Sequence, residues 1–232
     1  MINRMDKHPD IKALRSNRGC FEGGYEMAHK IITINRLSGS GGGQIGEMLA
    51  EKLGISCYDE QLRDMALDFG DLDESKHAEI FKKLQDEKKP NLAFYRTYDE
   101  GNLNVAPQMS ALDTVFDLEK KIMLKVSKEE DAVIIGRCGN WVFKDAEDVK
   151  VLSVFIMGSL KSRIDRVVAN SDMDAIEAKR HIKKVDRTRD DYYYYITKSD
   201  RDDLDSYGMV INSGIYDEET CVNLIAGAFE AL

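Results

Sequence analysis

The sequence that decides the fold reads Ile31-Ile32-Thr33-Ile34-Asn35-Arg36-Leu37-Ser38-Gly39-Ser40-Gly41-Gly42-Gly43-Gln44-Ile45-Gly46. Its first part is a short, β-branched apolar run, which predicts a buried strand. Glycines dominate the middle of the stretch. Apolar residues then recur at the spacing of one helix face, at Ile45, Met48, Leu49 and Leu53.

A strand, a glycine-rich loop and a helix in this order form a geometry that can bind phosphate. Glycine allows a positive φ and lets the backbone approach an anion without a Cβ in the way. The loop amides and the helix N-terminus supply hydrogen-bond donors and partial positive charge. We therefore expect phosphate contacts from Ser38, Gly39, Ser40, Gly41, Gly42, Gly43 and Gln44. The alternative is a flexible connection that binds nothing.

This loop departs from the P-loop motif Gly-x-x-x-x-Gly-Lys-Ser/Thr. Gly42 stands where the motif has its lysine, and neither Gly43 nor Gln44 offers the hydroxyl that holds magnesium. The usual positive charge at the β- and γ-phosphates is therefore missing from the loop. Arg36, at the end of the preceding strand, is the nearest candidate substitute.

Composition limits the possible functions. The chain has 232 residues, enough for one sizeable core, and a formal net charge of −9, which disfavours nucleic acid and anionic membrane as partners. No apolar run is long enough for a transmembrane helix, and the N-terminus lacks a signal-peptide core. Scattered cysteines and histidines predict neither disulfides nor a protein-held metal, so a cytoplasmic protein is expected.

Further apolar runs at 55–58, 132–135, 149–157 and 209–212 alternate with helical patterns. This alternation predicts a parallel sheet with helices on both faces. Asp59 and Arg137 follow two of these strands, at the edge where open α/β sheets build their sites. The alternatives are a helix cap for Asp59 and a surface position for Arg137.

A long helix is predicted from about Asp172 or Asp174 to Ile196, and it carries a concentration of positive charge. Its basic residues are Lys179, Arg180, Lys183, Lys184, Arg187 and Arg189. Arg189 falls on one stripe with Ile182 and Val185, which predicts that it faces inward. The alternative is a solvated basic face balanced by nearby aspartates.

As a set, these residues resemble the cytidylate kinase-like family, a branch of the P-loop nucleoside monophosphate kinases. The resemblance covers about residues 30–232. Its pieces are Ile32-Thr33-Ile34-Asn35-Arg36, Gly39-Ser40-Gly41-Gly42, Ile45-Gly46, Tyr58-Asp59, Ile134-Ile135-Gly136-Arg137, Arg163-Ile164-x-Arg166, Ile182-Lys183-Lys184-Val185-Asp186-x-x-Arg189-x-x-Tyr192-Tyr193 and Val210-Ile211-Asn212.

The resemblance implies an α/β fold of the P-loop NTPase type, with a parallel sheet sandwiched by helices. A single domain at 30–232 would follow a flexible N-terminal arm at 1–29. A helical insertion at about 62–128 would bind the acceptor, and a helical lid at about 160–196 would cover the phosphates.

The resemblance also implies site roles. ATP with Mg²⁺ would bind the glycine loop, with Arg36 and Arg163 contributing to that site. Arg187 and Arg189 would contact the transferring phosphates, and Asp186 would orient an arginine. Arg137 would hold the acceptor phosphate, and Asp59 would lie beside the acceptor.

Several functions remain open at this point. The first is a kinase that moves the γ-phosphoryl group of ATP to a nucleoside monophosphate, with CMP or dCMP favoured by resemblance. The second is a nucleotide-binding sensor or regulator without kinase activity, which the missing lysine favours. The third is a kinase for another small acceptor. A nucleic-acid binder is disfavoured by the overall negative charge.

Overall fold

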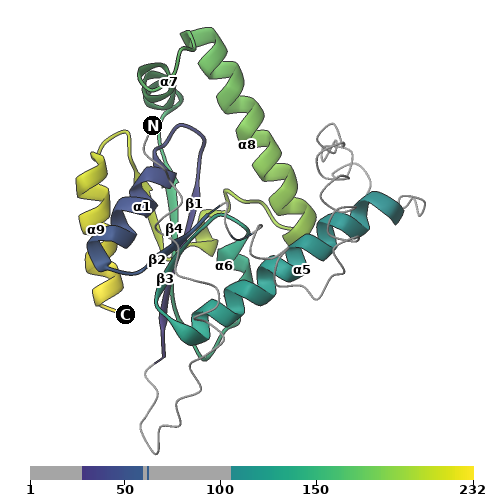
Figure 1. Ribbon diagram of the computed structural model, residues 1–232. Coiled ribbons are helices and arrows are strands. Elements are labelled where there is room, and N and C mark those ends of the chain that lie inside the picture. The colour runs from purple at the N-terminus through teal and green to yellow at the C-terminus, as the bar shows by residue number, and fades with distance from the viewer. Residues whose placement is uncertain (1–27, 60–61, 63–105) are drawn as a thin grey trace, which may run out of the picture.

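The computed structural model describes residues 28–59, 62 and 106–232 (Figure 1). Most of the predicted arm and most of the predicted insertion, residues 63–105, lie outside these residues. The strands are β1 (Lys30–Arg36), β2 (Ser56–Tyr58), β3 (Ala132–Ile135), β4 (Lys150–Met157) and β5 (Met209–Asn212). The helices are α1 (Gly42–Leu53), α5 (Ala106–Glu129), α6 (Gly139–Val142), α7 (Leu160–Ala169), α8 (Ala175–Thr197) and α9 (Glu218–Glu230), with a 3₁₀ turn at Leu204–Ser206.

The described strands form one parallel sheet in the order β2-β3-β1-β4-β5. β1 is central, with Ile31 opposite Ala132 of β3 and Lys30 opposite Lys150 of β4. Because the strands are parallel, their C-terminal ends share one edge of the sheet. That edge carries the glycine loop after β1 and the turns after β2 and β3.

Helices cover both faces of the sheet, as predicted. α1 and α9 pack together over one face, and α5 and α6 lie on the other (Figure 1). Alternate residues of β1 serve the two cores, because successive side chains of a strand point to opposite faces. Ile32 and Ile34 join the core beneath α1 and α9, whereas Ile31 joins the core beneath α5.

The predicted elements agree closely with the observed ones. β3 and β5 occupy the predicted residues, and α8 begins after Asp174, whose side chain caps it with Glu177 in a capping box. The sequence analysis missed α6, a single helical turn directly after β3. Within the described ranges, no helix combines the length and the apolar character needed to cross a lipid bilayer.

The two-sided burial of β1 leads to a stability prediction. Ile34 is 1% exposed in the core under α1, so Ile34→Ala should lower the free energy of unfolding by about 2–5 kcal/mol through lost burial and a cavity. Val210 of β5 is 39% exposed, and Val210→Ala should cost about 0.5 kcal/mol or less. Urea denaturation of both variants measures the difference. Equal losses would contradict the placement of β1 at the centre of the sheet.

Candidate active site

The glycine loop ends in a helix N-terminus without a side-chain cap. Gly39 and Gly41 both have φ of 77°, which glycine adopts without strain, and α1 begins at Gly42. Its N-cap residue, Gly41, provides no side-chain cap, no side chain in the described part of the chain bonds to the first amides of α1, and the first turn carries no acidic residue. By contrast, Ser159, Asp174 and Asp217 cap α7, α8 and α9. The first amides of α1 are therefore open to an anion.

Asp186 ties α7 and α8 to this loop. Its Oδ1 accepts a hydrogen bond from the backbone N–H of Ser38 at 2.7 Å, and its Oδ2 accepts one from Nη1 of Arg163 at 2.6 Å. Arg163 also donates to the carbonyl of Ser38 at 3.1 Å and, through Nε, to that of Gly158 at 3.1 Å. Charge-assisted bonds of this kind fix the loop relative to both helices.

Two arginines converge on the backbone carbonyl of Arg36. Arg201 donates to it from Nη1 at 2.6 Å, and Arg189 from Nη1 at 3.5 Å. Arg189 thus faces the loop from α8. The Arg201 side chain is 3% exposed, and its Nε donates to Oδ1 of Asp190 at 2.8 Å. Arg201 is not among the predicted site residues, because only its tertiary contacts reveal that it is buried.

The crowding and burial of the guanidinium groups lower their pKa values. Burial, followed by the charges of Arg36 and Arg201, lowers the pKa of Arg189 to about 10. The pKa of Arg36 is also lowered, first by burial and then by Arg137 and Arg201, while Asp59 acts in the opposite direction. At about 10, the pKa of Arg189 remains far above neutral pH, so this group stays protonated. The edge of the sheet therefore concentrates positive charge in a chain that is negative overall.

Asp59 and Arg36 face each other across the sheet edge. Nη2 of Arg36 lies 3.3 Å from Oδ1 of Asp59, which follows β2. Arg36 therefore links the end of the central strand to the end of β2. Arg36 is predicted to contribute to the ATP site, and Asp59 is predicted to lie beside the acceptor.

The turn after β3 has an unusual backbone. Gly136, Arg137 and Cys138 have φ of 78°, 53° and 54°, so two residues with side chains adopt the left-handed region. Such conformations are strained for residues with a Cβ and cluster at functional sites. The turn leads directly into α6 and sets Arg137 at the sheet edge.

Arg137 is held by a fully buried carboxylate. Its Nη1 lies 3.1 Å from Oε1 of Glu119 on α5, whose side chain is 0% exposed. After burial, Glu119 is the main cause that raises the pKa of Tyr192 on α8. The Glu119 carboxylate therefore joins α5, the β3 turn and α8. The sequence analysis missed Glu119, although an acidic residue between Leu118 and Ile122 of an amphipathic helix is a signal that could have identified it.

Arg187 is the predicted site residue that the structure keeps apart from the others. Its side chain is 73% exposed, and its Nε lies 3.9 Å from Oδ2 of Asp191 on the same helix. Arg166 lies beside Gly41 and forms an ion pair with Glu218 of α9. The remaining predicted residues gather along the C-terminal edge of the sheet, on the loop, α7, α8 and the turns after β2 and β3.

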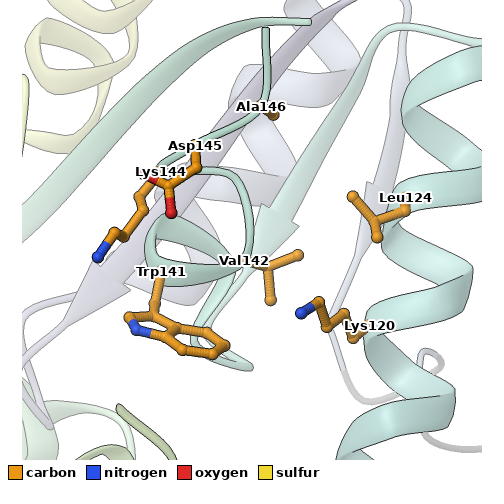
Figure 2. Close-up of a pocket in the computed structure, with 7 residues that line it drawn as sticks. All are labelled: Lys120, Leu124, Trp141, Val142, Lys144, Asp145 and Ala146. Atoms are coloured by element: carbon orange, nitrogen blue, oxygen red, sulfur yellow. The ribbon is translucent and has the colours of Figure 1, made fainter. Parts of the chain in front are cut away.

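A separate pocket of about 240 Å³ lies between α5 and the segment made of α6 and the residues that follow it, up to Ala146 (Figure 2). The indole of Trp141 forms one wall, and Nζ of Lys120 stands 5.3 Å from its ring centroid. The other lining residues are Leu124, Val142, Lys144, Asp145 and Ala146. None of the predicted site residues lines this pocket.

The strand order, the glycine loop after the central strand and the arginines around it define a P-loop kinase type of α/β fold. A sequence model of the cytidylate kinase-like family matches residues 31–215, and the chain belongs to that family. Family and fold together support a nucleotide kinase.

Individual proteins agree with this assignment. The chain is 26% identical over 199 residues to a cytidylate kinase of Archaeoglobus fulgidus, covering 86% of this chain and 94% of the relative. It is 25% identical over 206 residues to one of Methanocaldococcus jannaschii, covering 87% and 98%. An uncharacterized protein from Eubacterium ventriosum has the same fold, with a TM-score of 0.63 at 23% identity, covering 88% of this chain and all of that one.

The buried Arg137–Glu119 pair provides a second stability prediction. Glu119→Gln removes the carboxylate but leaves the guanidinium, so the free energy of unfolding should fall by about 3–5 kcal/mol. The matched control is Glu129→Gln at the partly exposed end of the same helix, where loss of the Lys125 pair should cost about 1 kcal/mol or less. Thermal and urea unfolding compare the two variants. A Glu119→Gln variant as stable as the control would contradict a structural role for the pair.

Proposed function

We propose that the protein is an ATP-dependent nucleoside monophosphate kinase whose acceptor is CMP or dCMP. The observation that carries this proposal is the convergence of Arg36, Arg137, Arg189 and Arg201 beside an uncapped helix N-terminus. Phosphoryl transfer has a highly anionic transition state, and its catalysis is mostly positioning and charge stabilisation. The acceptor preference rests on the family and on the names of the archaeal relatives.

The residues present fit the phosphates of ATP. The open amides of Gly42 and Gly43 would receive phosphate oxygens at the start of α1. For Mg²⁺ we assign no side-chain ligand. The Ser40 hydroxyl donates to the carbonyl of Leu37 at 2.8 Å, and the side chain at position 44 is exposed. Mg²⁺ commonly keeps phosphate oxygens and water as most of its ligands, so it would be bound with ATP.

The reaction attaches an acceptor phosphate oxygen to the γ-phosphorus as the bond to the β,γ-bridging oxygen breaks, releasing ADP. Arg189 would stabilise the charge on the transferring group from α8. Arg137 would hold the acceptor phosphate from the β3 turn, where Glu119 fixes its guanidinium. Asp186 would keep the loop and Arg163 in register. The insertion at about 62–128 would bind the rest of the acceptor, and 160–196 would act as the lid.

A nucleotide sensor without kinase activity is the second candidate, and the glycine at position 42 favours it. Coupled ADP release from Mg-ATP against CMP, dCMP, UMP and AMP separates the two functions. The proposal expects acceptor-dependent turnover that is highest with CMP or dCMP. ATP binding without turnover on any of these acceptors would favour the sensor.

A pair of arginines on one helix tests the mechanism. Arg189→Ala should lower turnover by ~10³-fold, the scale of losing an arginine that stabilises the transition state. Arg187→Ala serves as the matched comparison. Because its guanidinium is exposed and lies near Asp191, we expect a smaller loss, about 10-fold or less. Steady-state kinetics on both variants, with circular dichroism to confirm folding, measure the difference. Unchanged turnover in Arg189→Ala would remove Arg189 from the mechanism.

A further inference from the structure

The space at the lysine position of the loop is already filled by another side chain. A Cβ at Gly42 would lie 2.5 Å from Cβ and 3.0 Å from Cγ of Arg36, and the first of these distances is shorter than the contacts of real Cβ atoms. Any residue larger than glycine at this position would therefore collide with the stem of Arg36. By contrast, a Cβ at the neighbouring Gly43 would meet nothing within 4 Å.

A second glycine provides room for the other end of Arg36. Gly136 follows β3 with φ of +78°, and a Cβ there would lie 2.3 Å from Nη1 of Arg36. The Arg36 side chain thus runs from the end of β1, past the first residue of α1, to the turn after β3. Gly42 therefore lies against the stem of Arg36, and Gly136 lies against the end of its guanidinium group.

The guanidinium ends between the donor and the acceptor sides of the proposed site. Its Nη2 lies 3.3 Å from Asp59 after β2, and the side chain is only 16% exposed. Arg137 is close enough to depress the pKa of Arg36. Arg189 and Arg201 hold the Arg36 backbone through its carbonyl. The group is therefore a largely buried, pre-positioned cation that faces Asp59 and lies among several other cations.

We propose that Arg36, entering the site from β1, supplies the phosphate-binding charge that the loop lysine supplies in the usual motif. Gly42 is then the residue that allows this replacement, and not simply a lost lysine. When nucleotide binds, phosphate oxygens would replace Asp59 as the ion-pair partner of the Arg36 guanidinium. A guanidinium can contact two phosphate oxygens at once, which a single ammonium cannot do with the same geometry. This inference rests on the proposed function, because it assumes that ATP is bound at this loop.

The first test measures ATP affinity by calorimetry without an acceptor, alongside turnover with CMP. Arg36→Met keeps the stem against Gly42 and removes the charge. It should weaken ATP binding ~10- to 100-fold, the range for loss of a charge-assisted hydrogen bond. Arg36→Lys keeps a charge and should retain more of the affinity than Arg36→Met. Thermal melting confirms that each variant is folded. ATP affinity unchanged in Arg36→Met would overturn the inference.

The second test moves the charge back into the loop. Gly42→Lys alone should lower the melting temperature and give no gain in ATP affinity, because its Cβ collides with Arg36. In the Arg36→Gly background the Cβ and Cγ of residue 36 are both absent, and Gly42→Lys should restore at least ~10-fold of the affinity lost in Arg36→Gly. Arg36→Gly with Gly43→Lys is the matched control, with the same charge one residue away and no steric cost. Equal affinity of the two double variants would contradict the inference.

The outcomes separate this inference from the proposed function. Wild-type protein that binds ATP but turns over no acceptor refutes the proposed kinase activity. In that case the ATP affinities of the Arg36 variants still show whether Arg36 binds phosphate. Turnover on CMP with unchanged ATP affinity and kcat in Arg36→Met supports the kinase and refutes the role of Arg36. Wild-type protein that does not bind ATP refutes both.

Discussion

Buried positive charge at the C-terminal edge of the sheet is the constraint on which the rest of the site depends. Arg36, Arg137, Arg189 and Arg201 would repel one another if they lay together without compensation. Three of these four arginines form an ion pair with a carboxylate. Asp59 pairs with Arg36, Glu119 with Arg137, and Asp190 with Arg201. Among the described residues no carboxylate forms an ion pair with Arg189, and its pKa is lowered first by burial and then by the charges of Arg36 and Arg201. An incoming phosphate would relieve this repulsion and gain several donors at once.

The carboxylates also determine where the helices lie. Asp186 connects α8 to the glycine loop and to α7, while Glu119 connects α5 to the β3 turn. The residues that would recognise phosphate are thus placed by the same ion pairs that join the helices to the sheet. A change in one of these carboxylates should therefore affect both folding and the geometry of the site.

The sheet was predictable from short apolar runs that alternate with helical patterns, and β3, which is buried on both faces, is the clearest of these runs. The interval 132–135 coincides with β3, and 209–212 with β5. Site geometry was predictable only where periodicity applies. Arg189 lies in line with Ile182 and does face the loop, whereas Arg187, about 200° around the helix from it, faces solvent. Arg201 was not predicted because its contacts with Asp190 and with the carbonyl of Arg36 leave no local pattern in the sequence. Glu119 did leave a local signal, its position beside Leu118 on an amphipathic helix, but its partner Arg137 is distant in the sequence.

The most direct measurement of the central claim is a crystal structure with a bisubstrate analogue in which ATP and CMP are joined through their phosphates. The account predicts that the phosphate chain lies between the start of α1 and Arg137. It also predicts that Arg36 and Arg189 contact that chain and that Arg36 is drawn away from Asp59. Phosphates bound elsewhere, with Arg36 still paired to Asp59, would contradict the account.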